Sequence, residues 1–228
     1  MATISDNLQL VHARIAAACT QAGRPVQSVT LLVVSKTFGS DKVREAHAAG
    51  EHQFGENYVQ EALDKIQALQ DLRADLVWHL IGPLQSNKTR PVAEAFDWVH
   101  SVDRLKIAQR LSEQRPEHLP ALQVCLQVNI SGEASKSGVR PDEVPALAQA
   151  VAALPRLRLR GLMAIPETAQ TPDAQRQPHG ALRALLERLN AKGLALDTLS
   201  MGMSADLEAA VLEGSSLVRV GSAIFGAR

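Results

Sequence analysis

The sequence predicts a single (β/α)8 barrel, the TIM-barrel fold of the α/β class, on three observations. Short apolar runs of strand length alternate with longer, charge-containing helical segments along the whole chain. Eight such runs fit into 228 residues, and units of about 25 residues match the small end of this fold. No apolar run leads into a glycine-rich dinucleotide-binding turn. We therefore prefer the barrel to a doubly wound open sheet.

The first element is an amphipathic helix within residues 1–24. Leu8, Val11 and Ile15 recur there at helical spacing. The barrel units occupy residues 30–228, and the chain stops just after the last apolar run without an eighth helix of ordinary length. We expect the N-terminal helix to cover the flank that this missing helix would leave exposed.

The predicted strands share short runs of Val, Leu and Ile. They are Thr30–Lys36, His52–Asn57, Leu76–Gly82, Trp98–Asp103, Leu122–Ile130, Leu157–Ile165, Thr198–Met203 and Ser216–Phe225. Because a helical segment follows nearly every strand, the strands should be parallel and joined by right-handed crossovers.

The predicted helices lie between these strands, and several end at a glycine or proline. They begin near Ser40, Glu56, Ser86, Asp103, Pro141, Ala174 and Ser204. No linker, low-complexity tract or charge run divides the sequence, so we expect residues 1–228 to form one domain.

Composition excludes several classes of function. The 24 Lys and Arg residues balance the 24 Asp and Glu residues, so no overall positive field attracts nucleic acid or an anionic membrane. Aromatic residues make up 3% of the chain, which offers few stacking platforms for single strands. The sequence therefore predicts neither a nucleic-acid partner nor a membrane partner.

Cysteine and histidine spacing argues against a disulfide framework and a metal site. Cys19 and Cys125 lie far apart without a CxxC pattern, and the seven histidines show no HxxxH or HExxH spacing. His79, inside an apolar strand, is expected to be a buried histidine whose ring nitrogens are hydrogen-bonded. The N-terminal segment is too polar for a signal peptide or membrane span, so we expect a cytoplasmic protein.

Lys36 ends the first predicted strand, at the face where (β/α)8 barrels place their chemistry. Burial penalises the ammonium form and lowers a lysine's pKa toward a reactive free amine. Such an amine can form a Schiff base with an aldehyde. The alternative is a strand-end lysine that merely reaches solvent.

Glycine and serine follow the last two strands, at Gly202, Ser204, Gly221 and Ser222. Loops after strands seven and eight of a barrel commonly bind phosphate, with glycine permitting close approach. The alternative is ordinary turn chemistry, because both residue types also populate loops without ligands.

Arg219 alternates with Leu217 and Gly221 in the last strand, so it should face the same side as the proposed phosphate glycine. A buried guanidinium needs hydrogen-bond acceptors. They could be the carboxylates of Asp206 or Glu208, or a ligand acceptor such as an aromatic ring nitrogen.

Amide side chains end two other strands. Alternation in the fifth strand directs Gln127 and Asn129 into the barrel, and Asn57 ends the second strand in a similar place. These amides could hydrogen-bond one another or face a ligand at the mouth.

Several motifs in fixed order resemble one family over nearly the whole chain. They are VSKTF at 34–38, QFGENYVQEALDKI at 53–66, WHLIGPLQSNKTR at 78–90, NISGEASKSG at 129–138, RLRLRGLMAIP at 156–166, LSMGMSADLEAA at 199–210 and VRVGSAIFGAR at 218–228. Together they resemble the pyridoxal phosphate homeostasis proteins, the YggS-like family.

The resemblance implies an alanine-racemase-type barrel that carries pyridoxal 5′-phosphate (PLP) as a Schiff base on Lys36. Carried over position by position, it implies three groups of contacts to the cofactor. The phosphate would lie against Ser200, Ser204, Gly221 and Ser222, Arg219 would face the pyridine nitrogen, and Asn57 and Met203 would line the ring.

The resemblance also implies a function without established catalytic turnover. The family is thought to buffer and deliver PLP, which affects vitamin B6 and amino-acid balance, and its expected partners are PLP and, transiently, apo-enzymes that need it. Racemases of this fold use a tyrosine from a second domain as an acid/base, whereas this chain has Tyr58 as its one tyrosine. A monomer is expected.

Two alternatives remain open, and two departures from relatives stand out. The alternatives are a PLP-dependent amino-acid racemase and a cofactor-free Schiff-base aldolase, which would use Lys36 but would not need Arg219. Phe38 stands where relatives often carry a second lysine, and the chain ends without a basic tail. Lys136 is a candidate secondary PLP contact, with a solvated loop lysine as its alternative.

Overall fold

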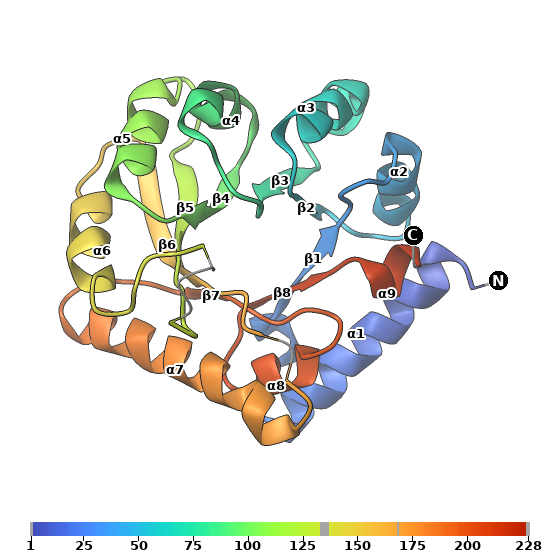
Figure 1. The fold of residues 1–228 in the computed structure, drawn as a ribbon. Coiled ribbons are helices and arrows are strands. Elements are labelled where there is room, and N and C mark those ends of the chain that lie inside the picture. The colour runs from blue at the N-terminus through green and yellow to red at the C-terminus, as the bar shows by residue number, and fades with distance from the viewer. Residues whose placement is uncertain (1, 133–136, 168, 227–228) are drawn as a thin grey trace.

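The strands of the computed structural model close into a parallel barrel in chain order, as the sequence predicts (Figure 1). The structure describes residues 2–132, 137–167 and 169–226. The strands are β1 (Thr30–Val34), β2 (Gln53–Glu56), β3 (Val77–Leu80), β4 (Trp98–Val102), β5 (Leu122–Gln127), β6 (Leu157–Met163), β7 (Thr198–Ser200) and β8 (Leu217–Val220). The barrel closes where β1 pairs with β8, from Thr30 beside Leu217 to Val33 beside Val220.

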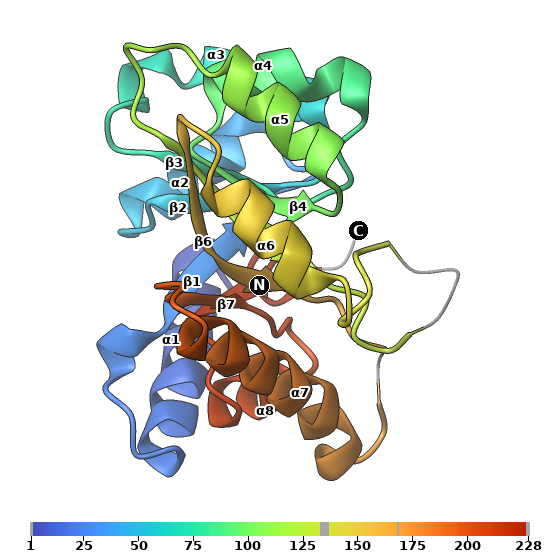
Figure 2. The same ribbon diagram turned by 90° about the vertical axis from the view of Figure 1, so that its left-hand side faces the viewer.

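Helices surround this barrel, and Figure 2 shows α3 to α5 on the opposite side of the strands from α1, α7 and α8. The helices are α1 (Ile4–Gln21), α2 (Ser40–Ala48), α3 (Val59–Ala68), α4 (Thr89–Ala95), α5 (Leu105–Gln114), α6 (Val144–Ala152), α7 (Pro172–Ala191), α8 (Leu207–Leu212) and α9 (Ser222–Phe225). In the described part of the chain, no helix is long and apolar enough to cross a membrane.

The strands are shorter than predicted, mainly at their carboxyl ends. Lys36, Asn57 and Met203 follow β1, β2 and β7 instead of ending them, so their side chains are carried by the loops at the mouth of the barrel. The last predicted strand is wrong beyond Val220. There Gly221, with φ −129° and ψ −65°, turns the chain out of the strand, and residues 222–225 form the short helix α9.

Helix α1 occupies the place of the missing eighth barrel helix, which confirms the expectation for the N-terminal segment. It contacts α8, α9 and α2 (Figure 1), and Leu8, Val11 and Ile15 lie on its buried face. Polar contacts fix it at both ends of this flank, since Asn7 Nδ2 donates to the Ile224 carbonyl at 2.8 Å and Arg14 Nε donates to Glu208 at 2.7 Å. The helix thus supports the segment after β8 that forms part of the barrel mouth.

Candidate functional site

A cavity of about 330 Å³ opens at the carboxyl ends of the strands, within the size range of small-molecule sites. Its described wall consists of Val34, Lys36, Phe38, Asn57, Ile81, Ile165, Met203, Ser204, Arg219, Gly221, Ser222 and Gly226. Seven of the eight predicted site residues belong to this wall, and Ser200 is the exception. Residues from six strand ends thus meet because parallel strands deliver their carboxyl ends to one face.

Lys36 is half-buried in this wall, on a segment that is fixed on both sides. Before it, the carbonyl of Ser35 accepts a hydrogen bond from Lys65 Nζ at 2.7 Å. After it, the backbone N–H of Thr37 donates to Glu61. Thr37 has φ +67°, a left-handed conformation that costs energy for a β-branched residue and needs such support.

The support comes from a buried ion-pair cluster of α3 and β2. Lys65 Nζ also donates to Glu56 Oε1 and Glu61 Oε1, each at 2.7 Å, and the Ser35 hydroxyl donates to Glu56 at 2.6 Å. Burial raises the pKa of Glu56, and Lys65 opposes this shift. The sequence patterns do not predict this cluster, although Glu56, Glu61 and Lys65 all lie in the motif at 53–66.

Arg219 lies 4% exposed between the barrel interior and the cavity. Its Nη1 donates to the Ser200 carbonyl at 2.6 Å and to the Ser200 hydroxyl at 2.8 Å, and its Nη2 donates to the Ala164 carbonyl at 2.8 Å. Burial lowers the pKa of Arg219 to about 10, which leaves it cationic at neutral pH. Two backbone carbonyls and the Ser200 hydroxyl, and not a carboxylate, accept the hydrogen bonds of Arg219.

The two carboxylates proposed as partners of Arg219 are bound elsewhere. Glu208 binds Arg14 of α1. Asp206 accepts hydrogen bonds from His179 at 2.9 Å and from the Met203 N–H at 2.7 Å. Burial raises the pKa of Asp206, but these bonds outweigh it, so the pKa lies below its usual value.

Ser200 lies deeper than predicted, within β7 and fully buried. Its hydroxyl is bound by Arg219 and lies 2.8 Å from His100 Nδ1. Ser200 is therefore not part of the described cavity wall. It contacts Arg219, which is. His79 behaves as predicted, because it is buried and both ring nitrogens are hydrogen-bonded, to His100 and Gln53.

The segments after β7 and β8 meet on one side of the cavity. The hydroxyls of Ser204 and Ser222 lie 3.3 Å apart. A Cβ atom on Gly221 would lie 2.7 Å from the carbonyl oxygen of Val34, so glycine is required for this close approach of the loop to β1. The cavity therefore presents two hydroxyls, an amine and a guanidinium, a set suited to an anionic ligand with a carbonyl group.

Asn57 carries a hydrogen-bonding atom that the described residues leave unsatisfied. Its Oδ1 is buried without a partner there, and the side chain belongs to the cavity wall. Buried acceptors normally have a donor, so this atom fits a ligand that brings one, directly or through water.

Other predicted positions are distributed around the mouth. Gln127 is 8% exposed and its Nε2 donates to the Ser137 carbonyl at 3.4 Å, whereas Asn129 Oδ1 accepts from the Gly132 N–H at 3.1 Å. Phe38 stacks on Phe225 with ring centroids 4.7 Å apart and forms an apolar part of the cavity wall. Lys136 lies outside the described residues.

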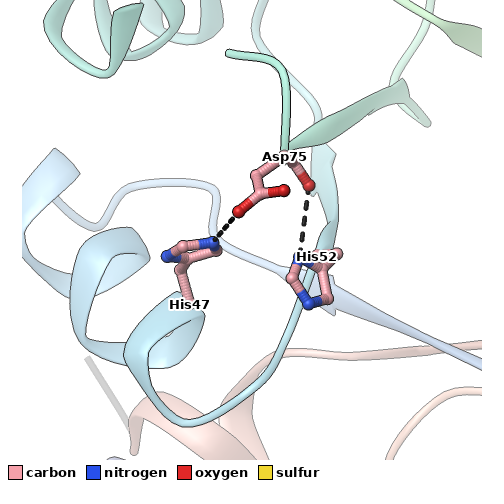
Figure 3. Close-up of side chains that lie close together, drawn as sticks. All are labelled: His47, His52 and Asp75. Atoms are coloured by element: carbon pink, nitrogen blue, oxygen red, sulfur yellow. Dashed lines mark hydrogen bonds and ion pairs between the residues drawn. The ribbon is translucent and has the colours of Figure 1, made fainter. Parts of the chain in front are cut away.

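One histidine and carboxylate cluster lies outside the cavity, among His47, His52 and Asp75 (Figure 3). The ligand atoms of these side chains lie within 4.8 Å of one another, which could admit a transition metal. His47 Nε2 lies 3.3 Å from the Asp75 carboxylate, and His52 Nδ1 lies 3.2 Å from the Asp75 carbonyl. These bonds account for the arrangement without an ion.

Comparison with known proteins identifies the family. Residues 7–228 match the family model of the alanine racemase N-terminal domain. The pyridoxal phosphate homeostasis protein of Pseudomonas aeruginosa is 64% identical over 100% of this chain and 97% of its own length. This chain belongs to the pyridoxal phosphate homeostasis proteins.

Other known proteins are similar to this chain in sequence or in structure. The pyridoxal phosphate homeostasis protein of Escherichia coli is 53% identical over 100% of this chain and 98% of its own length. The structure of PipY from Synechococcus elongatus with PLP bound matches with a TM-score of 0.82 and 39% identity, over 95% of this chain and 100% of that chain. An alanine racemase of Clostridium difficile, 14% identical with a TM-score of 0.76, shares the fold over 98% of this chain and 57% of its own.

Proposed function

We propose that this pyridoxal phosphate homeostasis protein binds PLP at the barrel mouth, as a Schiff base on Lys36, and buffers and delivers it. The observation that carries the proposal is the convergence of Lys36, Arg219 and the Ser204–Ser222 pair on one cavity. The PLP-bound structure of PipY supports the same cofactor. PLP supplies an aldehyde that condenses with an amine, and a ring that can withdraw electrons.

Each wall residue receives a role that suits its chemistry. Ser204, Ser222 and the close-packed Gly221 are proposed to hold the phosphate. Arg219 is proposed to face the pyridine nitrogen, and Asn57 and Met203 to line the ring. Ser200 is proposed to act through Arg219, since Arg219 donates to its hydroxyl.

Two features support a non-catalytic role. A permanent cation at the ring nitrogen disfavours its protonation and so weakens the ring as an electron sink. Tyr58 is 55% exposed and is not part of the described cavity wall, so it does not supply the opposite-face acid/base that a racemase needs. We therefore favour a carrier over an amino-acid racemase.

The deciding experiment is an absorption spectrum of the purified protein with and without PLP. An absorption band at about 420 nm is expected for PLP bound as a Schiff base to a lysine. It should be lost in Lys36→Ala and retained in Lys88→Ala, which removes an exposed lysine near the mouth. No band in the wild-type protein with excess PLP would refute the assignment.

Delivery is tested by mixing the loaded protein with apo-enzymes that require PLP. A carrier should restore their activity while converting amino acids no faster than free PLP does. Sustained amino-acid turnover above free PLP would favour the racemase instead. We further propose that the protein works as a cytoplasmic monomer whose contacts with such apo-enzymes are transient.

A further inference from the structure

A column of hydrogen-bonded side chains crosses the barrel interior from Gln53, at the start of β2, to Arg219 at the cavity. His79 Nε2 lies 2.7 Å from Gln53 Oε1, and His79 Nδ1 lies 2.9 Å from His100 Nε2. His100 Nδ1 lies 2.8 Å from the Ser200 hydroxyl, which Arg219 Nη1 also contacts at 2.8 Å. His79, His100 and Ser200 are at most 1% exposed.

The direction of the protons in this column follows from its Gln53 end, because an amide oxygen can only accept. His79 Nε2 therefore donates to Gln53 Oε1, and the Nδ1 of a neutral His79 accepts from His100 Nε2. The Nδ1 of a neutral His100 then accepts the proton of the Ser200 hydroxyl, whose oxygen accepts from Arg219 Nη1. All four contacts are thus satisfied by neutral rings.

A protonated ring would break this order. A proton on His100 Nδ1 would compete with the Ser200 proton for the same contact, and its charge would lie one hydroxyl away from the Arg219 cation. Burial lowers the pKa of His79 to about 3. Burial, followed by the charges of His79 and Arg219, lowers the pKa of His100 well below its usual value. Both effects keep the column neutral.

The column leaves Arg219 one orientation and a defined set of remaining donors. Its three bonds, to Ser200 and to the Ala164 carbonyl, involve Nη1 and Nη2. Two of the five guanidinium N–H groups, on Nε and Nη2, have no partner among the described residues and remain for a ligand. Because the Ser200 proton points to His100, the lone pairs of that hydroxyl are left to accept from Arg219.

We propose that His100 and His79 are positioning residues that act through Ser200 to hold Arg219 as an oriented cation against the ring nitrogen of PLP. This inference rests on the proposed function, since it assigns Arg219 to that nitrogen. Without the His100 acceptor, the Ser200 proton would turn toward another group and compete with the arginine. Arg219 would then lose its fixed direction, and the electronic state of the bound ring would change.

The test compares His100→Leu, which removes the acceptor, with His100→Asn, whose side-chain oxygen can still accept from Ser200. We expect His100→Leu to displace the absorption maximum of bound PLP and to accelerate PLP loss about tenfold, the scale of one neutral hydrogen bond. In His100→Asn, the absorption maximum and the rate of PLP loss should lie much closer to those of the wild-type protein. An unchanged maximum and loss rate in a folded His100→Leu protein would overturn the inference.

Ser200→Ala repeats the test with a smaller change, in case His100→Leu does not fold. The matched control is Ser215→Ala, which removes another fully buried serine hydroxyl, one bound to backbone carbonyls outside the column. The double variant of Ser200 and His100 should lose PLP no faster than the more affected single variant, because both remove the same link. Additive effects would contradict the column.

Nuclear magnetic resonance of the protein without added PLP separates this inference from the proposed function. The ¹⁵N shifts of the rings should show His79 and His100 neutral with the proton on Nε2, and the Arg219 Nε–H signal should move in His100→Leu. If wild-type protein shows no PLP band but these signals hold, the cofactor assignment fails and the column stands. A proton on Nδ1 of either ring would overturn the column.

Discussion

Lys65 Nζ donates to the carbonyl oxygen of Ser35 at 2.7 Å, one residue before Lys36. The same ammonium binds Glu56, whose side chain is fully buried. Helix α3 therefore holds the segment that carries Lys36 through a contact between residues that lie far apart in sequence. The position of Lys36 depends on an ion-pair cluster that lies behind the cavity wall.

Lys65→Met should destabilise the protein strongly. It leaves Glu56 buried without its cation, and removing one partner of a buried pair costs about 3–5 kcal/mol. Urea unfolding measures the loss, and weaker PLP binding should accompany it because the Lys36 segment is released. Lys42→Ala is the control, since its pair with Glu45 is exposed and its loss should leave the unfolding midpoint unchanged. Equal midpoints for all three proteins would contradict this role.

The sequence predicted the barrel and most of the cavity wall because both follow from local patterns. Strand-length apolar runs identify the strands, and the parallel arrangement brings their ends together. The positions of Lys36 and Gly221 near the ends of strands were enough to predict that they line the cavity. The resemblance implied that Ser200 contacts the phosphate, whereas the structure buries Ser200 within β7 and bonds its hydroxyl to Arg219.

Contacts between distant segments could not be predicted in this way. His100 and Ser200 are 100 residues apart, and they meet only because the barrel closes. The sequence offered Arg219 either a carboxylate, Asp206 or Glu208, or a ligand acceptor. In the structure, Arg219 instead donates to backbone carbonyls and to Ser200. The competing contact of Glu208 with Arg14 depends on where α1 docks, which strand patterns do not reveal.

Glu208→Gln should reduce stability at neutral pH and have no effect in acid. The hydrogen bond from Arg14 lowers the pKa of Glu208 below its usual 4.5. A lowered folded-state pKa stabilises the fold above the unfolded value, and this contribution disappears as the pH falls through the folded value. Urea midpoints of both proteins should therefore differ at pH 7 and converge as the pH falls through the lowered folded-state pKa of Glu208. A difference that persists unchanged in acid would exclude this origin.

Gly221→Ala should damage the cavity more than the fold. The added Cβ would lie 2.7 Å from the Val34 carbonyl oxygen, and relieving such a clash costs about 1–3 kcal/mol. Moving the loop would also shift Ser222, so PLP should bind more weakly in a titration. Gly180→Ala is the matched control, because Gly180 lies within helix α7 and its Cβ would meet the end of the Glu213 side chain, at 3.1 Å, instead of backbone. Equal PLP affinities in both variants would show that the close approach at Gly221 is not required.

Phe38→Leu tests whether the stacked ring pair closes the cavity beside Lys36. Phe38 and Phe225 lie 4.7 Å apart between ring centroids, and aromatic pairs contribute about 0.5–1.5 kcal/mol beyond their buried area. Because Phe225 belongs to α9, which packs on α1, losing the stack should loosen the C-terminal side of the wall. We expect PLP to dissociate a few-fold faster by stopped-flow absorbance, while Leu10→Ala, an exposed change on α1, leaves the rate as it is. An unaltered dissociation rate in Phe38→Leu would mean that the stack plays no part in retaining the cofactor.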